Sequence, residues 1–255
     1  MFNSRKLKII ISCEHGGNQI PEDLKKILKI PEAVLNSHEG LDIGALDLAK
    51  YLADYFDLDD FFYAETSRLV IELNRSEHHP KLFSRFSKKY LTQDNKINLI
   101  SNFYRPYRSN IENIIFNLIK QNYLIIHLSV HSFTPVLNHK IRDLDIGLLY
   151  DPRNKYEQDF CKVWQKELEK LNFKTRRNYP YQGASDGLTS YLRKIFKNNY
   201  LGIELETNQD LWQEKNIENK IKNREKISES LAKTVALSLT ALPFDLSHRR
   251  GKRNQ

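Results

Sequence analysis

Short apolar runs rich in Ile, Leu and Val alternate along this chain with longer segments of helical periodicity. The apolar runs predict buried strands, and the periodic segments predict helices. The predicted strands are Lys8–Cys13, Phe61–Tyr63, Leu69–Leu73, Tyr123–His131, Asp145–Tyr150 and Tyr200–Glu206. The predicted helices are Glu22–Leu28, Asp42–Phe56, Tyr104–Gln121, Lys155–Leu171, Leu188–Phe196 and a final helix from about Glu214 to Leu239.

The alternation of strands and helices sets the expected fold class. Strands that are separated by helices pair in parallel through right-handed crossovers. We therefore expect an α/β protein with three α/β/α layers around a mostly parallel, mixed sheet. Residues 1–242 form a single domain in this prediction, and residues 243–255 form a basic polar tail that we expect to be disordered.

Polar side chains lie at the ends of several predicted strands. His15 follows the first strand, Asn74 and Arg75 follow the run Leu69–Leu73, and His131 ends its own strand. Ligands of open α/β sheets bind in the crevice beyond the carboxyl ends of the strands. Because ionisable groups are costly to place beside a core without a role, these side chains predict one shared site.

Two histidines from separate strands, together with one carboxylate, suit a Zn²⁺ ion that keeps a fourth position open for water. His15 and His131 are the candidate imidazoles, and a hydrogen-bonded structural histidine is the alternative for each. The candidate carboxylates are Asp42, Glu14 and Glu39. Asp42 is equally well explained as the N-cap of the helix that it begins, so the residue pattern alone leaves the ligand set open.

Glu204 lies between apolar neighbours in a predicted strand. Burial favours the neutral form of a carboxyl group and brings it toward the range of a general acid or base. A salt-bridged strand residue is the alternative, and Glu206 shares the same face by alternation and competes for the role. Arg68 and Arg75 bracket an apolar run, where either guanidinium group could hold a substrate carboxylate bidentately or lie on the surface.

Composition and charge narrow the function classes. The formal net charge is +8 and the pI is near 9.2. Basic residues are interleaved with acidic ones along the helices, and we find no zinc-finger spacing, no RNP-like strand motif and no basic heptads, so we expect no nucleic-acid partner. Cys13 and Cys161 are too few for a disulfide framework, and we interpret both as structural.

The chain also lacks signs of a membrane location. No apolar stretch approaches the roughly 20 residues that span a bilayer. The first residues run into a strand pattern rather than a signal peptide with a cleavage site. We therefore expect a cytoplasmic protein without a membrane partner, and the sequence does not predict its oligomeric state.

Six short motifs follow one another along residues 8–210. They are Cys13-Glu14-His15-Gly16-Gly17-Asn18 with Ile20-Pro21; His38, Gly40, Asp42 and Gly44; Ser67-Arg68 with Glu72-Leu73-Asn74-Arg75; His131-Ser132; Asn178 with Pro180-Tyr181 and Gly183; and Ile203-Glu204-Leu205. In this order they resemble the N-formylglutamate amidohydrolase family. That family is distantly similar to the zinc carboxypeptidases and to the aspartoacylase/succinylglutamate desuccinylase group.

The resemblance implies a role for several residues. By similarity to the zinc enzymes, His15 and His131 bind zinc, Asn74 with Arg75 holds the substrate carboxylate, and Glu204 activates water. The HxxE pattern of those relatives reads His15-Gly16-Gly17-Asn18 here, so the third ligand must come from elsewhere. The segment around Asp42 looks like the aspartate position of the family. The resemblance therefore implies Asp42 as the third ligand, with Glu14 as the second choice.

The activity implied by the resemblance is zinc-dependent hydrolysis of the amide bond of an N-acyl amino acid, with one zinc ion per chain. Arg68 or Tyr181 would stabilise the developing oxyanion, and Arg75 would favour a small acidic substrate such as N-formylglutamate. A zinc carboxypeptidase, a peptidoglycan-type amidase and a non-catalytic protein that binds acidic ligands are the alternatives. A pocket closed by the loop Pro180–Gly187 would favour a single acylated amino acid, and an open groove would favour a polymer.

Overall fold

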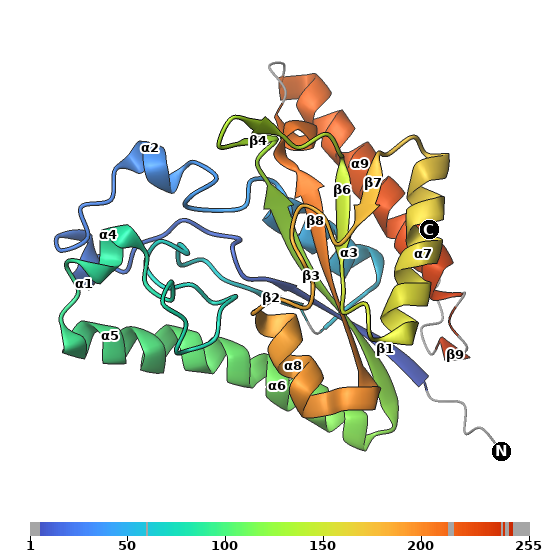
Figure 1. The fold of residues 1–255 in the computed structure, drawn as a ribbon, viewed down its shortest axis with the longest axis horizontal. Coiled ribbons are helices and arrows are strands. Elements are labelled where there is room, and N and C mark those ends of the chain that lie inside the picture. Colours follow the sequence, from blue (N-terminus) through green and yellow to red (C-terminus); the bar gives the residue numbers. More distant parts are fainter. Residues whose placement is uncertain (1–5, 60, 214–216, 241, 243–244, 247–255) are drawn as a thin grey trace, which may run out of the picture.

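A mixed β-sheet forms the centre of the molecule (Figure 1). The computed structural model describes residues 6–59, 61–213, 217–240, 242 and 245–246 of the chain. The strands lie in the order β2 (Phe61–Tyr63), β1 (Lys6–Cys13), β3 (Tyr123–Phe133), β8 (Tyr200–Asn208), β6 (Ile146–Leu149) and β7 (Thr175–Arg177). β9 (Asp245–Leu246) pairs with β1, and β4 (Val136–Leu137) with β5 (Lys140–Ile141) forms a separate hairpin.

Most neighbouring strands of the sheet are parallel. β1 pairs in parallel with β2, β3 and β9, and β3 pairs in parallel with β8. β6 runs antiparallel to β8, and β7 follows the direction of β6. The carboxyl ends of β1, β3 and β8 therefore lie at one edge of the sheet, which is where α/β proteins place their ligands.

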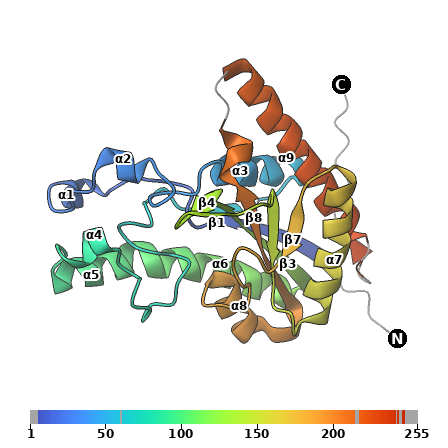
Figure 2. The same cartoon turned by 45° about the horizontal axis from the view of Figure 1, so that its top comes forward.

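Helices cover both faces of the sheet (Figures 1 and 2). α3 (Ala45–Tyr55), α7 (Lys155–Lys170) and α9 (Ile217–Leu239) pack on one face, and α6 (Arg105–Lys120) and α8 (Leu188–Phe196) cover the other. The three-layer α/β/α fold with a mostly parallel sheet is thus confirmed.

The two faces of β3 belong to different cores. Ile126 and Leu128 join the core under α3, α7 and α9, whereas Ile125 joins the core under α6 and α8. Because side chains alternate along a strand, His127 and His131 lie on the same face as Ile125. The polar positions of the sheet therefore face α6 and α8.

A group of short helices extends from one side of the sheet (Figure 2). It contains α1 (Glu22–Lys25), α2 (Glu32–Leu35), α4 (Arg85–Lys88) and α5 (Gln93–Leu99), and a π-helical turn at Ile100–Tyr104 joins α5 to α6. Its apolar side chains form a buried cluster of their own, which includes Leu24, Val70 and Ile71. We call this part, residues 16–41 and 64–104, the helical extension.

The apolar run Leu69–Leu73 does not form a strand, so this prediction is wrong. Residues 68–70 form a turn, and the Ser67 hydroxyl accepts a hydrogen bond of 3.2 Å from the Leu69 backbone N–H. The run is apolar because it fills the core of the helical extension rather than because it pairs in a sheet. An apolar run of this length does not by itself distinguish these two environments.

Part of the predicted C-terminal tail forms a strand. Asp245 and Leu246 pair with Lys6 and Leu7 of β1, while residues 243–244 and 247–255 lie outside the described residues. Among the helices that the structure describes, none has the length and apolar character that crossing a membrane requires.

Gly44 sets the start of α3. Its φ is +82°, a left-handed conformation that is costly for residues with a Cβ. A Cβ at this position would also lie 2.2 Å from a ring carbon of the buried Trp212. The helix that was expected to begin at Asp42 therefore begins at Ala45, and Gly44, rather than the side chain of Asp42, occupies its N-cap.

We expect Gly44→Ala to lower the free energy of unfolding by about 2–5 kcal/mol, because a left-handed L residue costs about 1–2 kcal/mol and overpacking against Trp212 costs about 1–3 kcal/mol. Urea denaturation with a constant m value measures this loss. Ala53→Gly within the same helix is the control, with an expected loss of about 1 kcal/mol. A loss at Gly44 no larger than that of the control would contradict this account.

Candidate active site

Two imidazole rings converge on one carboxylate at the carboxyl edge of the sheet. Asp42 Oδ2 lies 3.2 Å from His15 Nδ1 and 2.9 Å from His131 Nδ1. The centroids of the two rings are 4.8 Å apart. All three side chains are buried, and among the described residues they form the group whose donor atoms could hold a metal ion. The structure thus brings the three predicted metal ligands together.

The local backbone explains why Asp42 meets His15. Gly17 allows the chain to turn after β1 against the backbone of Glu65, since a Cβ on Gly17 would lie 2.1 Å from the Glu65 carbonyl oxygen. The Asp42 backbone N–H then donates a 3.0 Å hydrogen bond to the His15 carbonyl oxygen. His131 reaches the same point from β3, and the Ser132 N–H lies 3.3 Å from Asp42 Oδ2.

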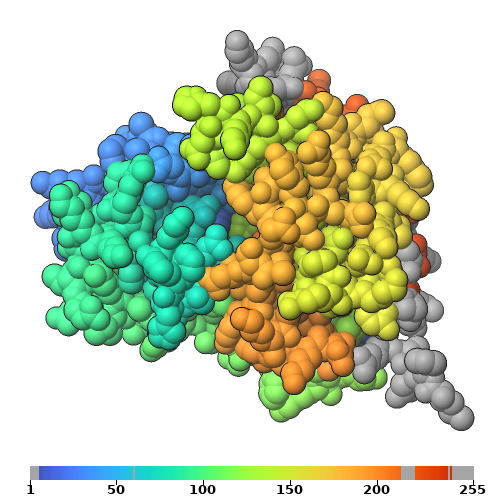
Figure 3. Space-filling model, viewed as in Figure 1, coloured from blue at the N-terminus to red at the C-terminus, as the bar shows by residue number. Residues whose placement is uncertain are grey.

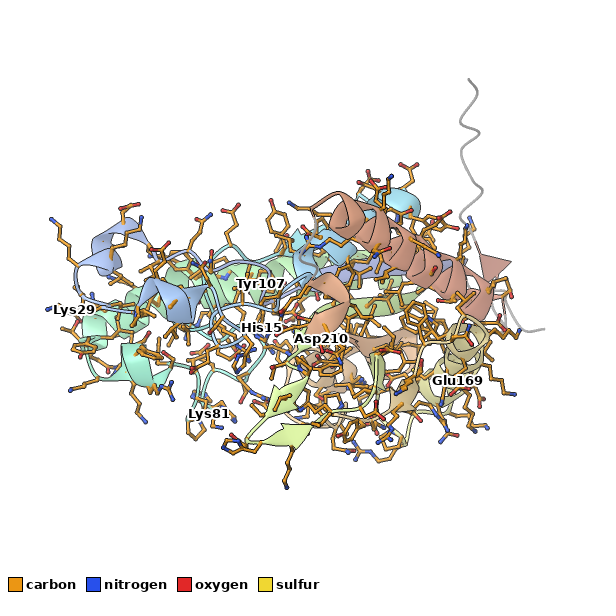
Figure 4. All side chains as sticks on the ribbon, turned by 90° about the horizontal axis from the view of Figure 1, so that it is seen from above. His15, Lys29, Lys81, Tyr107, Glu169 and Asp210 are labelled. Carbon is orange, nitrogen blue, oxygen red and sulfur yellow. The ribbon has the colours of Figure 1, made fainter. Side chains whose placement is uncertain are left out.

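The other ring nitrogen of each histidine faces a second buried carboxylate. His15 Nε2 contacts Glu72 Oε1, and His131 Nε2 lies 3.0 Å from Glu14 Oε2. Glu14, the second choice for the third ligand, therefore lies on the side of His131 opposite Asp42. Its Oε1 accepts a 2.9 Å hydrogen bond from the Tyr107 hydroxyl. Figure 4 shows His15 in the middle of the molecule among converging side chains, with Tyr107 close by.

Glu72 is a site residue that the sequence analysis missed as a functional candidate. It lies within the apolar run Leu69–Leu73, and the strand that this run predicts gives it no functional role. Its position just before the candidate binding residues Asn74 and Arg75 was the feature of the sequence that could have indicated a functional role. The third candidate carboxylate, Glu39, lies away from this group and pairs with the exposed Arg85 at 2.7 Å.

Arg68 neutralises part of the negative charge of the carboxylates around His15 and His131. Its Nη2 lies 2.7 Å from Glu72 Oε2, and its Nη1 lies 3.3 Å from Asp42 Oδ1. The guanidinium group thus bridges two of the three carboxylates around the histidines. Since both bonding edges of Arg68 are engaged, it is less suited to clamp a substrate carboxylate than to hold the site together.

The buried charges shift one another's pKa values. Burial opposes the charged forms, but the histidines and Arg68 outweigh it and lower the pKa values of Asp42, Glu14 and Glu72. Burial likewise opposes the charged imidazoles, and the same carboxylates outweigh it: the pKa of His15 is raised, and that of His131 is raised well above its usual value. Without a metal, both rings therefore favour the doubly protonated form.

Two glutamates of β8 lie beside the group formed by His15, Asp42 and His131. The parallel register places Glu206 opposite His131 and Glu204 opposite Ser129. Glu206 is 6% exposed, and its Oε2 is the buried side-chain oxygen without a hydrogen-bond partner among the described residues. Burial, reinforced by the charges of Asp42 and Glu204, raises the pKa of Glu206 to about 7. Glu204 is partly exposed and accepts a 2.9 Å hydrogen bond from the Thr189 hydroxyl.

Asn74 and Arg75 form one wall of the site. Asn74 Oδ1 accepts a 2.7 Å hydrogen bond from the Leu188 N–H at the start of α8, and its Nδ2 lies 3.4 Å from His131 Nε2. The Arg75 guanidinium donates to the Asp186 carbonyl oxygen. The segment that carries Asn74 and Arg75 is thereby joined to the end of the loop at residues 178–187.

That loop also carries Tyr181. The Tyr181 hydroxyl lies 3.1 Å from Arg142 Nη1. Burial raises the pKa of Tyr181, and the negative charges of Glu206 and Asp42 act in the same direction. Figure 3 shows a recess where the helical extension meets the β4–β5 hairpin (yellow-green) and this loop (gold).

Burial determines the chemistry of two residues beside the site, Cys13 and His127. Cys13 is fully buried, and burial raises the pKa of its thiol well above the usual value, so it is not an activated nucleophile. His127 is fully buried between the Ser12 hydroxyl at 2.7 Å and the Tyr200 hydroxyl at 2.6 Å. Its pKa is lowered to about 4, mainly by burial, so it is a neutral structural histidine.

The shifted pKa values predict how the metal-free protein responds to pH. The raised pKa of His131 stabilises the fold below the unfolded pKa of about 6.5, and this contribution is lost as the pH rises through the raised value. The lowered pKa values of the carboxylates stabilise the fold above about 4, and that contribution is lost in acid. We expect the free energy of unfolding to decline from pH 6 to pH 9 in chelator.

Urea denaturation across this pH range measures the decline, and it should be shallower in His131→Gln. His78→Gln, which removes an exposed histidine, is the matched control and should retain the wild-type slope. An unchanged slope in His131→Gln would contradict the assignment of the pH dependence to this group.

Comparison with known proteins gives the family and the fold of the chain. Residues 7–213 match the family model for N-formylglutamate amidohydrolase. A gene product of Agrobacterium tumefaciens is 25% identical in sequence, with a TM-score of 0.76 over 93% of this chain and 92% of that one. N-formylglutamate amidohydrolase from Ralstonia eutropha JMP134 has the same fold, with a TM-score of 0.72 and 16% identity over 94% and 97% of the two chains.

No functionally curated protein matches the sequence. The family match nevertheless spans most of the chain and contains every residue of the site described above. The chain therefore belongs to the N-formylglutamate amidohydrolase family.

Proposed function

We propose that this protein is a zinc-dependent amidohydrolase that removes the formyl group from a small acidic N-formyl amino acid such as N-formylglutamate. One observation carries the proposal: the imidazole rings of His15 and His131 both contact Asp42 through Nδ1. The Nε2 atom of each ring contacts a separate glutamate carboxylate. The family match supports the amidohydrolase class. The metal, the acyl group and the amino acid are parts of the proposal.

The residues present fit a zinc ion. The proposed ligands are His15, Asp42 and His131, because two imidazole nitrogens and one carboxylate oxygen are a donor set that catalytic zinc uses. Ligand atoms of a tetrahedral zinc lie about 3.3 Å apart, and the two separations from Asp42 Oδ2 are 3.2 and 2.9 Å. Carboxylates that hold the second nitrogen of a ligating histidine are typical of such sites, and Glu72 and Glu14 occupy those positions.

The chain's own residues would then divide the reaction among them. When bound, zinc supplies Lewis-acid polarisation of the formyl carbonyl group and favours the deprotonation of water at neutral pH. Glu206, whose pKa is about 7, takes the proton of the attacking water and returns it to the leaving amine. The carbon–nitrogen bond breaks, and formate and the free amino acid are released. Arg75 with Asn74 holds the α-carboxylate.

The loop at residues 178–187 favours a small substrate over a polymer. Its end is tied to the opposite wall by the Asp186 carboxylate, which accepts a 2.9 Å hydrogen bond from the Ser76 N–H, and by the Leu188 N–H, which donates to Asn74. These bonds close that side of the site. This closure supports a single acylated amino acid rather than a peptidoglycan strand as the substrate.

The proposal is tested by a hydrolysis screen over N-formyl, N-acetyl and N-succinyl derivatives of glutamate, with zinc content measured on the same sample. We expect N-formyl-L-glutamate to be hydrolysed, a chelator to stop the reaction and zinc to restore it. A zinc-loaded protein that hydrolyses none of these amides would show that the proposed function is wrong.

The proton-transfer role is tested by comparing Glu206→Gln with Glu204→Gln. Because the unpartnered oxygen belongs to Glu206, we expect Glu206→Gln to keep zinc and to lower kcat by about 10²–10⁴-fold. Glu204→Gln should lose less, since Glu204 is bonded to Thr189. The opposite order would return the role to Glu204, the residue that the family resemblance implies.

The contribution of Glu14 is tested by the affinity for zinc. We expect Glu14→Gln to weaken zinc binding about 10–100-fold, because the His131 Nε2 proton loses its charged acceptor. Competition with a chromophoric chelator measures the affinity without reference to activity. Glu39→Gln is the control, since Glu39 pairs with an exposed arginine. Equal affinities in the two variants would contradict a positioning role for Glu14.

A further inference from the structure

Arg142 is a buried arginine that no part of the proposed mechanism uses. It lies between β5 and β6 and is 9% exposed. Its Nη1 donates hydrogen bonds to the Tyr181 hydroxyl at 3.1 Å and to the Thr134 carbonyl oxygen at 3.4 Å. The guanidinium group also stacks over the rings of Tyr181 and Phe133, at 5.0 and 5.9 Å from their centroids.

Arg142 differs from Arg68 and Arg193 in the charge that surrounds it. Arg68 is paired with Glu72 and Asp42, and Arg193 is paired with Glu157 at 2.8 Å. In the part of the chain that the structure describes, no carboxylate pairs with Arg142; its partners are a neutral hydroxyl group and a carbonyl group. A guanidinium group without a counter-charge is costly to bury, so this position is suited to an anion that comes from outside the chain.

Arg108 shows what a purely structural buried arginine looks like in this protein. Its Nη1 donates to the carbonyl oxygens of Leu73 and Arg75, at 2.9 and 3.2 Å, and its guanidinium group lies 4.5 Å from the centroid of the Tyr191 ring. These contacts anchor the backbone on both sides of Asn74. Arg142 does not anchor the backbone on two sides in this way. One of its two hydrogen-bond partners is the Tyr181 side chain, which is itself 45% exposed.

The position of Arg142 is at the rim of the active site. Tyr181 follows Tyr179 and Pro180, and this stretch packs on Gly147 beside Glu206: a Cβ on Gly147 would meet the Tyr179 carbonyl oxygen at 2.4 Å and the Glu206 Cβ at 3.2 Å. The hairpin before Arg142 and the loop that carries Tyr181 both border the recess of Figure 3. Arg142 therefore stands at the mouth of the site that contains Glu206.

An acidic N-acyl amino acid carries two carboxylates, and a guanidinium group can bind either of them bidentately. Arg68 is already engaged by two carboxylates of the chain, and Arg108 is engaged by two backbone carbonyl groups. Arg75 and Arg142 remain as guanidinium groups near the site that are engaged by neither two carboxylates nor two backbone carbonyl groups, and neither has a carboxylate partner among the described residues. We propose that Arg142, together with the Tyr181 hydroxyl, binds the side-chain carboxylate of the substrate and makes the site selective for dicarboxylates. This inference rests on the proposed function, in which Arg75 takes the α-carboxylate.

The test compares N-formyl-L-glutamate with N-formyl-L-glutamine, which differ in the side-chain charge and little in size. In Arg142→Met the ratio of the two kcat/KM values should fall about 10–100-fold, mainly through KM for the glutamate substrate. The kcat/KM for the glutamine substrate should fall by a smaller factor than that for the glutamate substrate. Arg176→Met, which removes an exposed arginine stacked on Tyr179, is the control for long-range charge and should keep the wild-type ratio.

A purely structural role for Arg142, as a support for the Tyr181 side chain, predicts a different result. If Arg142 only held Tyr181 in place, Arg142→Met would slow both substrates by the same factor and leave their ratio unchanged, which would overturn the inference. Circular dichroism and zinc content show whether the variant is folded. Should it not fold, Arg142→Lys replaces it: the charge stays, the planar fork is lost, and the ratio should fall by a smaller factor, whereas an unchanged ratio again overturns the inference.

Binding of glutarate separates this inference from the proposed function. Calorimetric titration of the zinc-loaded protein with glutarate requires no turnover. Weaker glutarate binding in Arg142→Met, in a protein that hydrolyses no N-formyl amino acid, would support the dicarboxylate site and refute the activity. Hydrolysis with an unchanged substrate ratio would refute the dicarboxylate site and leave the activity standing. A wild-type protein that neither binds glutarate nor hydrolyses the formyl amides would refute both.

Discussion

Asp42 Oδ2 accepts from two imidazoles at once, and the rest of the site is arranged around the consequences of that contact. Three carboxylates and two histidines lie buried within a few residues of one sheet edge, which is costly unless each charge is met by an opposite one. Glu72 and Glu14 contact the Nε2 atoms of His15 and His131. Arg68 pairs with both Glu72 and Asp42. Removing one member would leave a buried charge without its partner.

The need to pair these buried charges explains why part of the helical extension lies against the edge of the sheet. Arg68 and Glu72 come from the segment 68–73, most of which the sequence predicted as a strand, and the buried apolar residues of that segment pack in the core of the helical extension. The same segment continues into Asn74 and Arg75, whose backbone is held by Arg108 of α6. The extension therefore delivers both the charges that balance the histidines and the wall that faces the substrate.

The sequence predicts the parts of the structure that depend on local patterns. The strand ends that carry His15 and His131 follow from apolar runs and alternation, and the helix Leu188–Phe196 is found with its predicted bounds. The turn at residues 68–70 could not be predicted, because a run that fills a small separate core has the same composition as a strand. Glu72 was missed for the same reason. The proposed choice of Glu206 over Glu204 rests on the burial of Glu206 and on its unpartnered Oε2, which depend on tertiary contacts that one sequence does not contain.

The two histidines of β3 show how strongly position along one strand decides chemistry. His127 and His131 lie on the same face, and burial opposes the charged form of both. His127 meets only hydroxyl groups, from Ser12 and Tyr200, so burial prevails and its pKa falls to about 4. His131 lies four residues further along β3, between the carboxylates of Asp42 and Glu14, and its pKa rises. Among the described residues, the group that could hold an ion therefore lies at the edge of the sheet, where segments far apart in sequence bring charged side chains together.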